Sequence, residues 1–437
     1  MKFTHRLERF FKIRESHSSL KTEWMAGFTT FLTVAYIVLV NPAILGSVGI
    51  DPEAAFVATC LASALGCILT GVMANYPIAV APSMALNAYF AYVIVQGLGY
   101  TWQAALGAVF LSGILFLLMT ITGLRQWIIR AIPESLHIAI SAGVGLFIAL
   151  LAFKSNGIVV SNPHTLLSLG VIDSPSALLF LVGFSMIVGL DTLKVPGAIM
   201  IGILATTVLG LIMGVNHFAG FLATPPSLKA TFWQFDIHSL FQTQGLSIIF
   251  SFFLVALFDS AGTLVGVLQH PIFKQDPKRS QKMTRALVAD SIATIAGATL
   301  GTSTLSPYIE SASGIRAGGR TGLTSVIVGL FFLAALFFSP LANTIPIYAT
   351  AAALLFVSTL MIKTLVHLDW DDLSECVPSV VTFLMIPFSF SIADGVGIGF
   401  ITYCMIQLFC GKVKKLSPML LGMTALFVVY FMYRPHL

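Results

Sequence analysis

Residues 301–311, GTSTLSPYIES, place groups that could bind a ligand inside a long apolar region. The stretch carries five Ser/Thr hydroxyls, Tyr308 and Glu310. A carboxylate at bilayer depth costs roughly 2.5–3.5 kcal/mol on insertion scales, and such residues usually face a pathway or a charged partner. Glu310 is therefore a candidate for ligand binding or proton exchange.

Pro307 interrupts any helix through this stretch. Proline lacks a backbone N–H and pushes the residue before it, here Ser306, toward an extended conformation. Broken backbone at this depth persists only where it is buried in protein or lines a cavity. We expect a short extended segment followed by a half-helix that starts within the membrane, with Glu310 in its first turn.

Residues 74–96 show the same interruption. Pro77 and Pro82 bracket four apolar residues, and a helical pattern begins only after Pro82, which puts Asn87 in about the second turn. A matched pair of interrupted segments in corresponding positions of two halves points to the binding site of a secondary transporter. The half-helices would also bring free N–H groups and positive dipole ends to that site.

Asp259, in the string FDSAGT, is a second carboxylate near the middle of an apolar helix. Where two carboxyl groups share a dry site, one is expected to hold a proton, which suits coupling to a proton gradient. A bond to a neighbouring helix is the alternative role for Asp259. Asp290, in the following helix, is as compatible with a structural role as with a functional one.

Asn87 would offer an amide opposite Glu310 if the two interrupted segments cross, and a helix–helix hydrogen bond is its alternative. Tyr308 and Tyr89 could stack on a flat ligand, although aromatic residues in membrane helices often serve packing. The histidines and the five cysteines lack metal-ligand spacing, and phosphate-binding glycine motifs are absent. We expect no metal and no cofactor, so transport would be driven by an ion gradient.

The composition is that of a membrane protein. It is 57% hydrophobic and 9% charged, whereas a globular domain carries about 25% charged residues. Apolar windows near twenty residues recur from Met25 to the C-terminus, which predicts a polytopic helical protein. The helix after the basic first 23 residues is too long for a signal-peptide core, so we expect no cleavable signal. We expect no nucleic-acid partner, because the net charge of +5 follows membrane topology.

Fourteen segments are expected to cross the bilayer, in two halves joined by a polar connection at 216–245 with a short amphipathic piece at 237–243. A last apolar run, 416–431, is either a fifteenth crossing or a tail against the bundle. The expected segments are about 24–45, 54–73, 74–96, 103–123, 135–153, 176–191, 195–215, 246–268, 284–300, 301–317, 321–340, 345–363, 376–391 and 394–410.

The positive charges support this topology. With the N-terminus in the cytoplasm, only Lys154, Lys229 and Arg434 of the 23 Lys and Arg residues lie outside. Cytoplasmic loops are expected to carry the excess of Lys and Arg. Because seven is odd, two halves of seven crossings have opposite orientations.

Three strings give the chain a specific resemblance. The strings ANYPIAVAPSMALNAYFAY (74–92), FDSAGTLVGV (258–267) and TSTLSPYIESASGIRAGGRTGLT (302–324) resemble the AzgA-like purine permeases, a branch of the nucleobase:cation symporter superfamily that also holds the uracil and xanthine permeases. The resemblance extends from the N-terminal KIRE string to about residue 411.

The resemblance implies an all-α membrane fold of two inverted seven-helix repeats. It divides the chain into a core domain and a gate domain, with short antiparallel strands of segments 3 and 10 meeting at the site. The implied ranges are a cytoplasmic lead-in at 1–23, the core at 24–123 and 246–340, the gate at 124–215 and 345–411, the connection at 216–245 and a tail at 412–437.

The resemblance also assigns site residues. Asp259 and Glu310 become the acids of helices 8 and 10, Asn87 the amide of helix 3, and Tyr308 a base-contacting aromatic. Thr263 stands where the uracil branch has a histidine, so that proton role does not transfer. Ser311, Thr263 and Tyr89 are further candidate substrate contacts. Ser306-Pro307 departs from the hydroxyl or small residues that relatives usually have.

These residues predict proton-coupled uptake of purine nucleobases across the cell membrane, with guanine and hypoxanthine as the expected substrates. Asp259 and Glu310, the proton-coupling candidates, would accept the base's N–H donors, and Asn87 with the half-helix amides would meet its acceptors. Adenine is the alternative substrate. An anion transporter of related architecture, a channel and a non-transporting receptor are further alternatives, whereas no motif indicates an enzyme. A homodimer is kept as a possible assembly.

Overall fold

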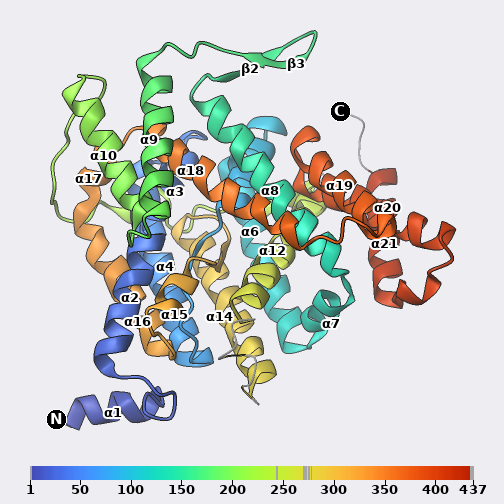
Figure 1. Cartoon of the computed structure of the whole chain (residues 1–437), viewed down its shortest axis with the longest axis horizontal. Helices are drawn as coiled ribbons and strands as arrows, with labels where there is room; N and C mark the ends of the chain where they lie inside the picture. Colours follow the sequence, from blue (N-terminus) through green and yellow to red (C-terminus); the bar gives the residue numbers. More distant parts are fainter. Residues whose placement is uncertain (1, 243–244, 269–272, 274–275, 277, 434–437) are drawn as a thin grey trace.

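The computed structural model describes residues 2–242, 245–268, 273, 276 and 278–433, which form a bundle of helices with two short strand pairs (Figure 1). The first half of the chain holds α1 (Lys2–Phe10), α2 (Leu20–Val34), α3 (Ile37–Gly46), α4 (Pro52–Ala74), β1 (Val80–Pro82), α5 (Met84–Ala88), η1 (Tyr89–Gly97), α6 (Trp102–Ile121), α7 (Leu124–Ala131), α8 (Glu134–Ser155), β2 (Val159–Asn162), β3 (Leu166–Leu169), α9 (Pro175–Thr192) and α10 (Ala198–Ile212).

The second half holds η2 (Leu228–Ala230), α11 (His238–Gln242), α12 (Gly245–Leu268), α14 (Arg279–Leu300), β4 (Leu305–Pro307), α15 (Ser311–Arg316), α16 (Gly322–Ala335), η3 (Leu336–Phe338), α17 (Ser339–Thr344), α18 (Ile347–Ile362), η4 (Lys363–His367), α19 (Leu373–Phe388), α20 (Ile392–Phe409), η5 (Val413–Lys415) and α21 (Pro418–Tyr433). The amphipathic piece predicted at 237–243 corresponds to α11, and Thr243 lies outside the described residues.

Within the described ranges, eight helices are long and apolar enough to cross a membrane. Five shorter apolar helices join them, at Met84–Gly97, Ala198–Ile212, Ile248–Leu257, Leu373–Phe388 and Pro418–Met432. Twelve of these helices fall on predicted segments, and Pro418–Met432 falls on the last apolar run. The predicted segments 284–300 and 301–317 are not among them, because α14 carries charged residues and the second is divided into β4 and the short α15. The expectation of a polytopic helical membrane protein is confirmed.

The two interrupted segments pair as predicted. β1 and β4 are antiparallel, with Val80 opposite Pro307, Ala81 opposite Ser306 and Pro82 opposite Leu305. Both strands are fully buried. The helix after β1 is not regular, because α5 continues as the π-helix η1, a feature that the sequence did not reveal. Segment 10 continues as the short helix α15.

The register explains why prolines are tolerated in these strands. Antiparallel pairs alternate between hydrogen-bonded and non-hydrogen-bonded positions. The N–H of Tyr308 donates to Ala79 O and the N–H of Ser83 donates to Thr304 O, both at 2.9 Å. Pro82 and Pro307 therefore occupy the non-bonded positions between them, where a missing N–H costs the ladder nothing.

The first span differs from the prediction. It was expected as one helix over 24–45, but it begins at Leu20, which Ser19 caps, and it is interrupted between α2 and α3 at Ala35 and Tyr36. At the interruption the turn tightens, because Val38 and Leu39 donate backbone hydrogen bonds to residues only three positions earlier (3.1 Å each). Pro42 lies in the following helix, and proline is a common cause of such kinks.

The helices pack in two sets. α4 packs against α14 and α16, which in turn contact α6 and α2. α8 packs against α18 and α19, α19 packs against α20, and α9 contacts α10 and α18. An unpredicted hairpin of β2 and β3 follows α8, at the end of the bundle away from α1 (Figure 1).

α21 is not a loose tail, because it packs antiparallel along α20. Thr424 lies 3.1 Å from the Cys404 sulfur, and the Phe427 and Phe400 rings are 5.6 Å apart. Near the end of the helix, the Tyr430 hydroxyl donates to the buried Asp394 at 3.1 Å. The apolar run at 416–431 thus returns along most of α20, which favours a crossing.

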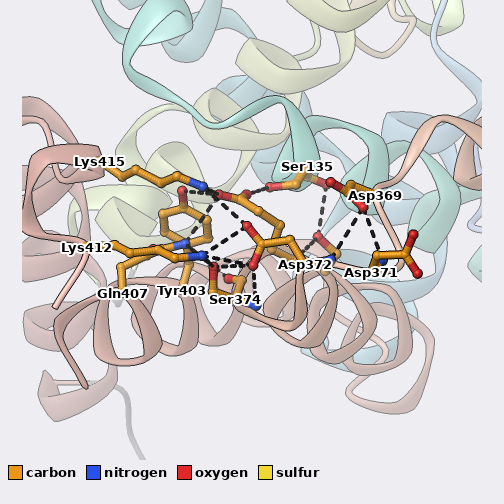
Figure 2. Close-up of polar contacts among 11 residues, drawn as sticks. Ser135, Asp369, Asp371, Asp372, Ser374, Tyr403, Gln407, Lys412 and Lys415 are labelled. Atoms are coloured by element: carbon orange, nitrogen blue, oxygen red, sulfur yellow. Dashed lines mark hydrogen bonds and ion pairs between the residues drawn. The ribbon is translucent and has the colours of Figure 1, made fainter. Parts of the chain in front are cut away.

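Two lysines fasten the segment before α21 to the start of α19 (Figure 2). Lys412 Nζ lies 3.0 Å from Asp372 Oδ1, and Lys415 Nζ lies 2.8 Å from Glu375 Oε1. Hydrogen bonds from Ser374 and then from Lys412 lower the pKa of Asp372. The lysine and carboxylate side chains of these two pairs are partly exposed to solvent. The pairs therefore fix the position of the segment before α21 more than they add to the free energy of unfolding.

The crossing of α4 and α16 depends on glycine. A Cβ added to Gly322 would lie 1.9 Å from the carbonyl oxygen of Gly71, whereas a Cβ at Gly422 in α21 would meet nothing within 4 Å. We expect Gly322→Ala to destabilise the protein by about 1–3 kcal/mol through overpacking. Thermal unfolding of the purified protein in detergent measures this loss.

Gly422→Ala is the matched control. It makes the same substitution without a steric conflict, and it removes a helix glycine, which is expected to stabilise by about 0.5–1 kcal/mol. Equal unfolding temperatures for the two variants would contradict the tight crossing of α4 and α16.

Candidate functional site

Asp259 on α12 faces the paired strands. Its side-chain neighbours include the hydroxyls of Ser83, directly after β1, and Ser306, within β4. One carboxylate oxygen, Oδ2, is buried and has no hydrogen-bond partner among the described residues. A buried polar atom without a partner is costly unless a ligand or a proton satisfies it. Asp259 Oδ2 is therefore available to accept a hydrogen bond from a ligand, as the predicted role of Asp259 requires.

Glu310 lies at the N-cap of α15 rather than within its first turn. The Tyr36 hydroxyl donates to Glu310 Oε1 at 2.9 Å. Tyr36 is completely buried and sits at the interruption between α2 and α3. Sequence reasoning did not predict Tyr36 as a site residue. The feature that could have indicated it is a tyrosine within an apolar helix, six residues before Pro42.

The two predicted aromatic contacts differ in their surroundings. The Tyr308 hydroxyl donates to Pro82 O at 2.5 Å and ties the ring to β1. Tyr308 lies near both Glu310 and Asp259. Tyr89 is buried in η1, with its ring edge-on to Phe252 at 5.2 Å. A stacking role for either residue stays a prediction.

Asn87 belongs to a buried amide network. Its Nδ2 donates to Asn41 Oδ1, and its Oδ1 accepts a 2.5 Å hydrogen bond from Ser303. Asn41 also donates to Thr59 (2.6 Å) and Thr302 (2.8 Å). The helix–helix bond that the sequence left open for Asn87 is present, and a contact with a ligand stays a prediction.

Ser311 and Thr263 were the remaining candidates. Ser311 is buried, and its hydroxyl accepts the backbone N–H of Ala79 at 2.9 Å, which closes one end of the strand pair. Thr263 lies one turn after Asp259 on α12 and is partly buried. Among the described residues, no group of three His, Cys, Asp or Glu side chains could hold a metal ion.

Asp290 has a partner that the sequence did not predict. Arg125 Nη2 lies 3.1 Å from Asp290 Oδ2, and both side chains are buried. The Arg125 guanidinium also lies 4.5 Å above the Phe116 ring. Ser260, next to Asp259, contacts Asp290. Arg125, which the charge distribution places on the cytoplasmic side, is a buried residue that joins α7 to α14.

A bundle of apolar helices thus brings two interrupted segments together beside the carboxyl groups of Asp259 and Glu310, which is the architecture of a secondary transporter. The model of the xanthine and uracil permeases, described as "Permease family", matches residues 21–403. The chain belongs to this permease family and is a membrane transport protein, not an enzyme.

Relatives match over nearly the full length. The chain is 45% identical to adenine permease AdeP of Escherichia coli, covering 98% of this chain and 96% of the relative. It is 42% identical to guanine/hypoxanthine permease PbuG of Bacillus subtilis, covering 98% of this chain and all of the relative. The resemblance to the purine permease branch is confirmed.

Solved structures share the fold at low sequence identity. The transmembrane domain of the cyanobacterial bicarbonate transporter BicA superposes with a TM-score of 0.64 at 16% identity, covering 88% of this chain and 97% of that chain. The overall structure of SLC26A9 gives a TM-score of 0.63 at 15% identity, covering 93% of this chain and 69% of that chain. These likenesses show the fold alone.

The Arg125–Asp290 pair predicts a distinctive mutational pattern. Removing one partner of a buried pair leaves an uncompensated charge, so Arg125→Met should destabilise the protein by about 3–5 kcal/mol. The double variant Arg125→Met/Asp290→Leu should recover most of that loss, because it leaves no buried charge. Thermal unfolding in detergent measures both variants, and equal destabilisation of the two would contradict the pairing.

Proposed function

We propose that this protein imports purine nucleobases by proton symport, with Asp259 and Glu310 as the groups that bind the base. The observation that carries the proposal is the buried Oδ2 of Asp259, which lacks a hydrogen-bond partner among the described residues. Purine bases present ring N–H and amino donors, and charge-assisted hydrogen bonds to a carboxylate are the stronger kind. The relatives named adenine permease and guanine/hypoxanthine permease support the same substrate class.

The remaining site residues would surround the base. Tyr308, which lies near both acids, is the proposed stacking surface. Asn87, Ser311, Thr263 and Tyr89 are proposed as flanking residues. The bonds of Asn87 and Ser311 favour an indirect role for these two, because their polar atoms already hold the strand pair and its neighbours.

Proton coupling would use the same acids. Asp259 and Glu310 lie close enough for their charges to interact, and two carboxylates in a dry site favour holding one proton between them. Binding of the base and protonation would then be linked, so that a proton gradient drives accumulation.

Movement would take place between the two helix sets. We assign 24–123 and 246–340 to the core domain that carries the site, and 124–215 and 345–411 to the gate domain. The proposed location is the cell membrane with a cytoplasmic N-terminus, which follows from the distribution of Lys and Arg. A homodimer is the proposed assembly.

Anion transport is the second candidate, because solved structures with this fold include a bicarbonate transporter and an anion transporter. Two carboxylates at the strand crossing oppose an anionic ligand, since like charges in a poorly solvated site repel. The acids of the site therefore favour a neutral nucleobase.

Removal of either acid should abolish concentrative uptake. In cells that lack their own purine uptake, Asp259→Asn and Glu310→Gln should each lower kcat/KM for radiolabelled adenine or hypoxanthine at least tenfold, since a hydrogen bond to a charged group contributes about 1.5–3 kcal/mol. Asp394→Asn is the control, because it alters a buried carboxylate in α20 that bonds Tyr430 instead.

A competition assay separates the substrates. Unlabelled adenine, guanine, hypoxanthine, uracil and bicarbonate are tested against the labelled base at two pH values, with and without an uncoupler. Competition by purines only, with faster uptake at the lower pH and loss of accumulation with the uncoupler, is expected. Normal uptake in both acid variants, or competition by bicarbonate alone, would refute the assignment.

A further inference from the structure

Tyr36 lies where the first span loses its regular hydrogen bonding. α2 ends at Val34 and α3 begins at Ile37, so Tyr36 occupies the two-residue interruption. Its side chain is among the largest that are completely buried. The interruption thus places a long polar side chain in the interior, at the depth of the strand crossing.

The Tyr36 side chain reaches the site from a third element. Its hydroxyl donates to Glu310 Oε1 at 2.9 Å across 274 positions of sequence. The Tyr308 side chain also lies near Tyr36, so Tyr36 is close to the proposed stacking surface. The span formed by α2 and α3 therefore contributes to a site that the interrupted segments alone were expected to form.

The chemistry of this contact is specific. A phenol has one O–H donor, and a carboxylate has two oxygens that accept in the carboxylate plane. The backbone N–H of Glu310 contacts the same carboxylate. These contacts restrict rotation of the carboxylate about its terminal bond, which otherwise is broad.

We infer that Tyr36 is a positioning residue for substrate binding: it holds Glu310 Oε1 so that Oε2 is presented to an N–H of the purine. The inference rests on the proposed function, because it deepens the role of Glu310 in that site. Tyr36 acts through Glu310, and its hydroxyl pre-organises the acceptor before the base arrives.

If the hydrogen bond between Tyr36 and Glu310 served only folding, its loss would change the kinetics of uptake in a different way. Loss of a structural hydroxyl lowers the number of folded transporters, which reduces Vmax and leaves KM unchanged. Loss of a positioning bond raises KM in the molecules that do fold, because a mobile acceptor must be ordered when the base binds.

The test is Tyr36→Phe, which removes only the hydroxyl. Initial uptake of radiolabelled adenine and hypoxanthine is measured over a range of concentrations and normalised to membrane protein that elutes as a single folded species. KM should rise about tenfold, with Vmax per folded transporter within about twofold of the wild type. An unchanged KM, or a loss confined to Vmax, would overturn the inference.

Tyr348→Phe is the matched control. Tyr348 is a buried tyrosine in α18 whose hydroxyl donates to Asn216 Oδ1 at 3.1 Å, outside the proposed site. Its loss should leave KM unchanged. A KM increase equal to that of Tyr36→Phe would show that any buried hydroxyl has this effect, which would also overturn the inference.

A second measurement does not depend on transport. Dicyclohexylcarbodiimide modifies buried carboxyl groups, and mass spectrometry gives the rate of modification at Glu310. Tyr36→Phe should raise that rate severalfold, whereas Tyr348→Phe should not. If the wild type takes up neither base, the proposed function fails. The rate of modification at Glu310 then decides alone whether Tyr36 holds this side chain. An equal rate in the wild type and Tyr36→Phe would overturn the inferred role of Tyr36.

Discussion

The pairing of β1 with β4 is the constraint on which the rest of the site depends. Inside a bilayer, backbone N–H and C=O groups find no water, so a broken helix must obtain its partners from protein. Two segments from opposite halves of the chain solve this problem for each other. The prolines that break the helices occupy the positions of the register where no N–H is needed. Pro307 is therefore compatible with the pairing, despite its difference from the residues usual in relatives.

The pairing of β1 with β4 also determines where the polar side chains of the site lie. The strand ends bring Ser83, Ser306 and Glu310 toward Asp259, and the short helices that follow direct their N-termini to the same place. The amide network around Asn41 and Asn87 holds α3, α4 and α5 against the residues that precede β4. These bonds hold the surroundings of the acids, and Asp259 Oδ2 is one of the buried polar atoms without a partner among the residues that the structure describes.

The sequence predicted those features that local chemistry determines. Proline positions predicted the interrupted segments, which the strand pair confirms. The orientation from the Lys and Arg distribution and the binding roles of Asp259 and Glu310 stay predictions. Features that depend on contacts between distant segments could not be predicted. Tyr36 meets Glu310, and Arg125 meets Asp290, across more than 160 positions of sequence. The π-helix η1 has no signature in an apolar run, because its hydrogen-bond pattern depends on packing.

The position of α21 has a consequence for work on the purified protein. The Phe427 ring lies between Phe400 of α20 and Phe250 of α12, the helix that carries Asp259. A C-terminal affinity tag or a truncation that displaces α21 would therefore disturb a helix of the site through a single aromatic contact. Affinities measured on shortened or fused chains are best compared with those of the unmodified sequence.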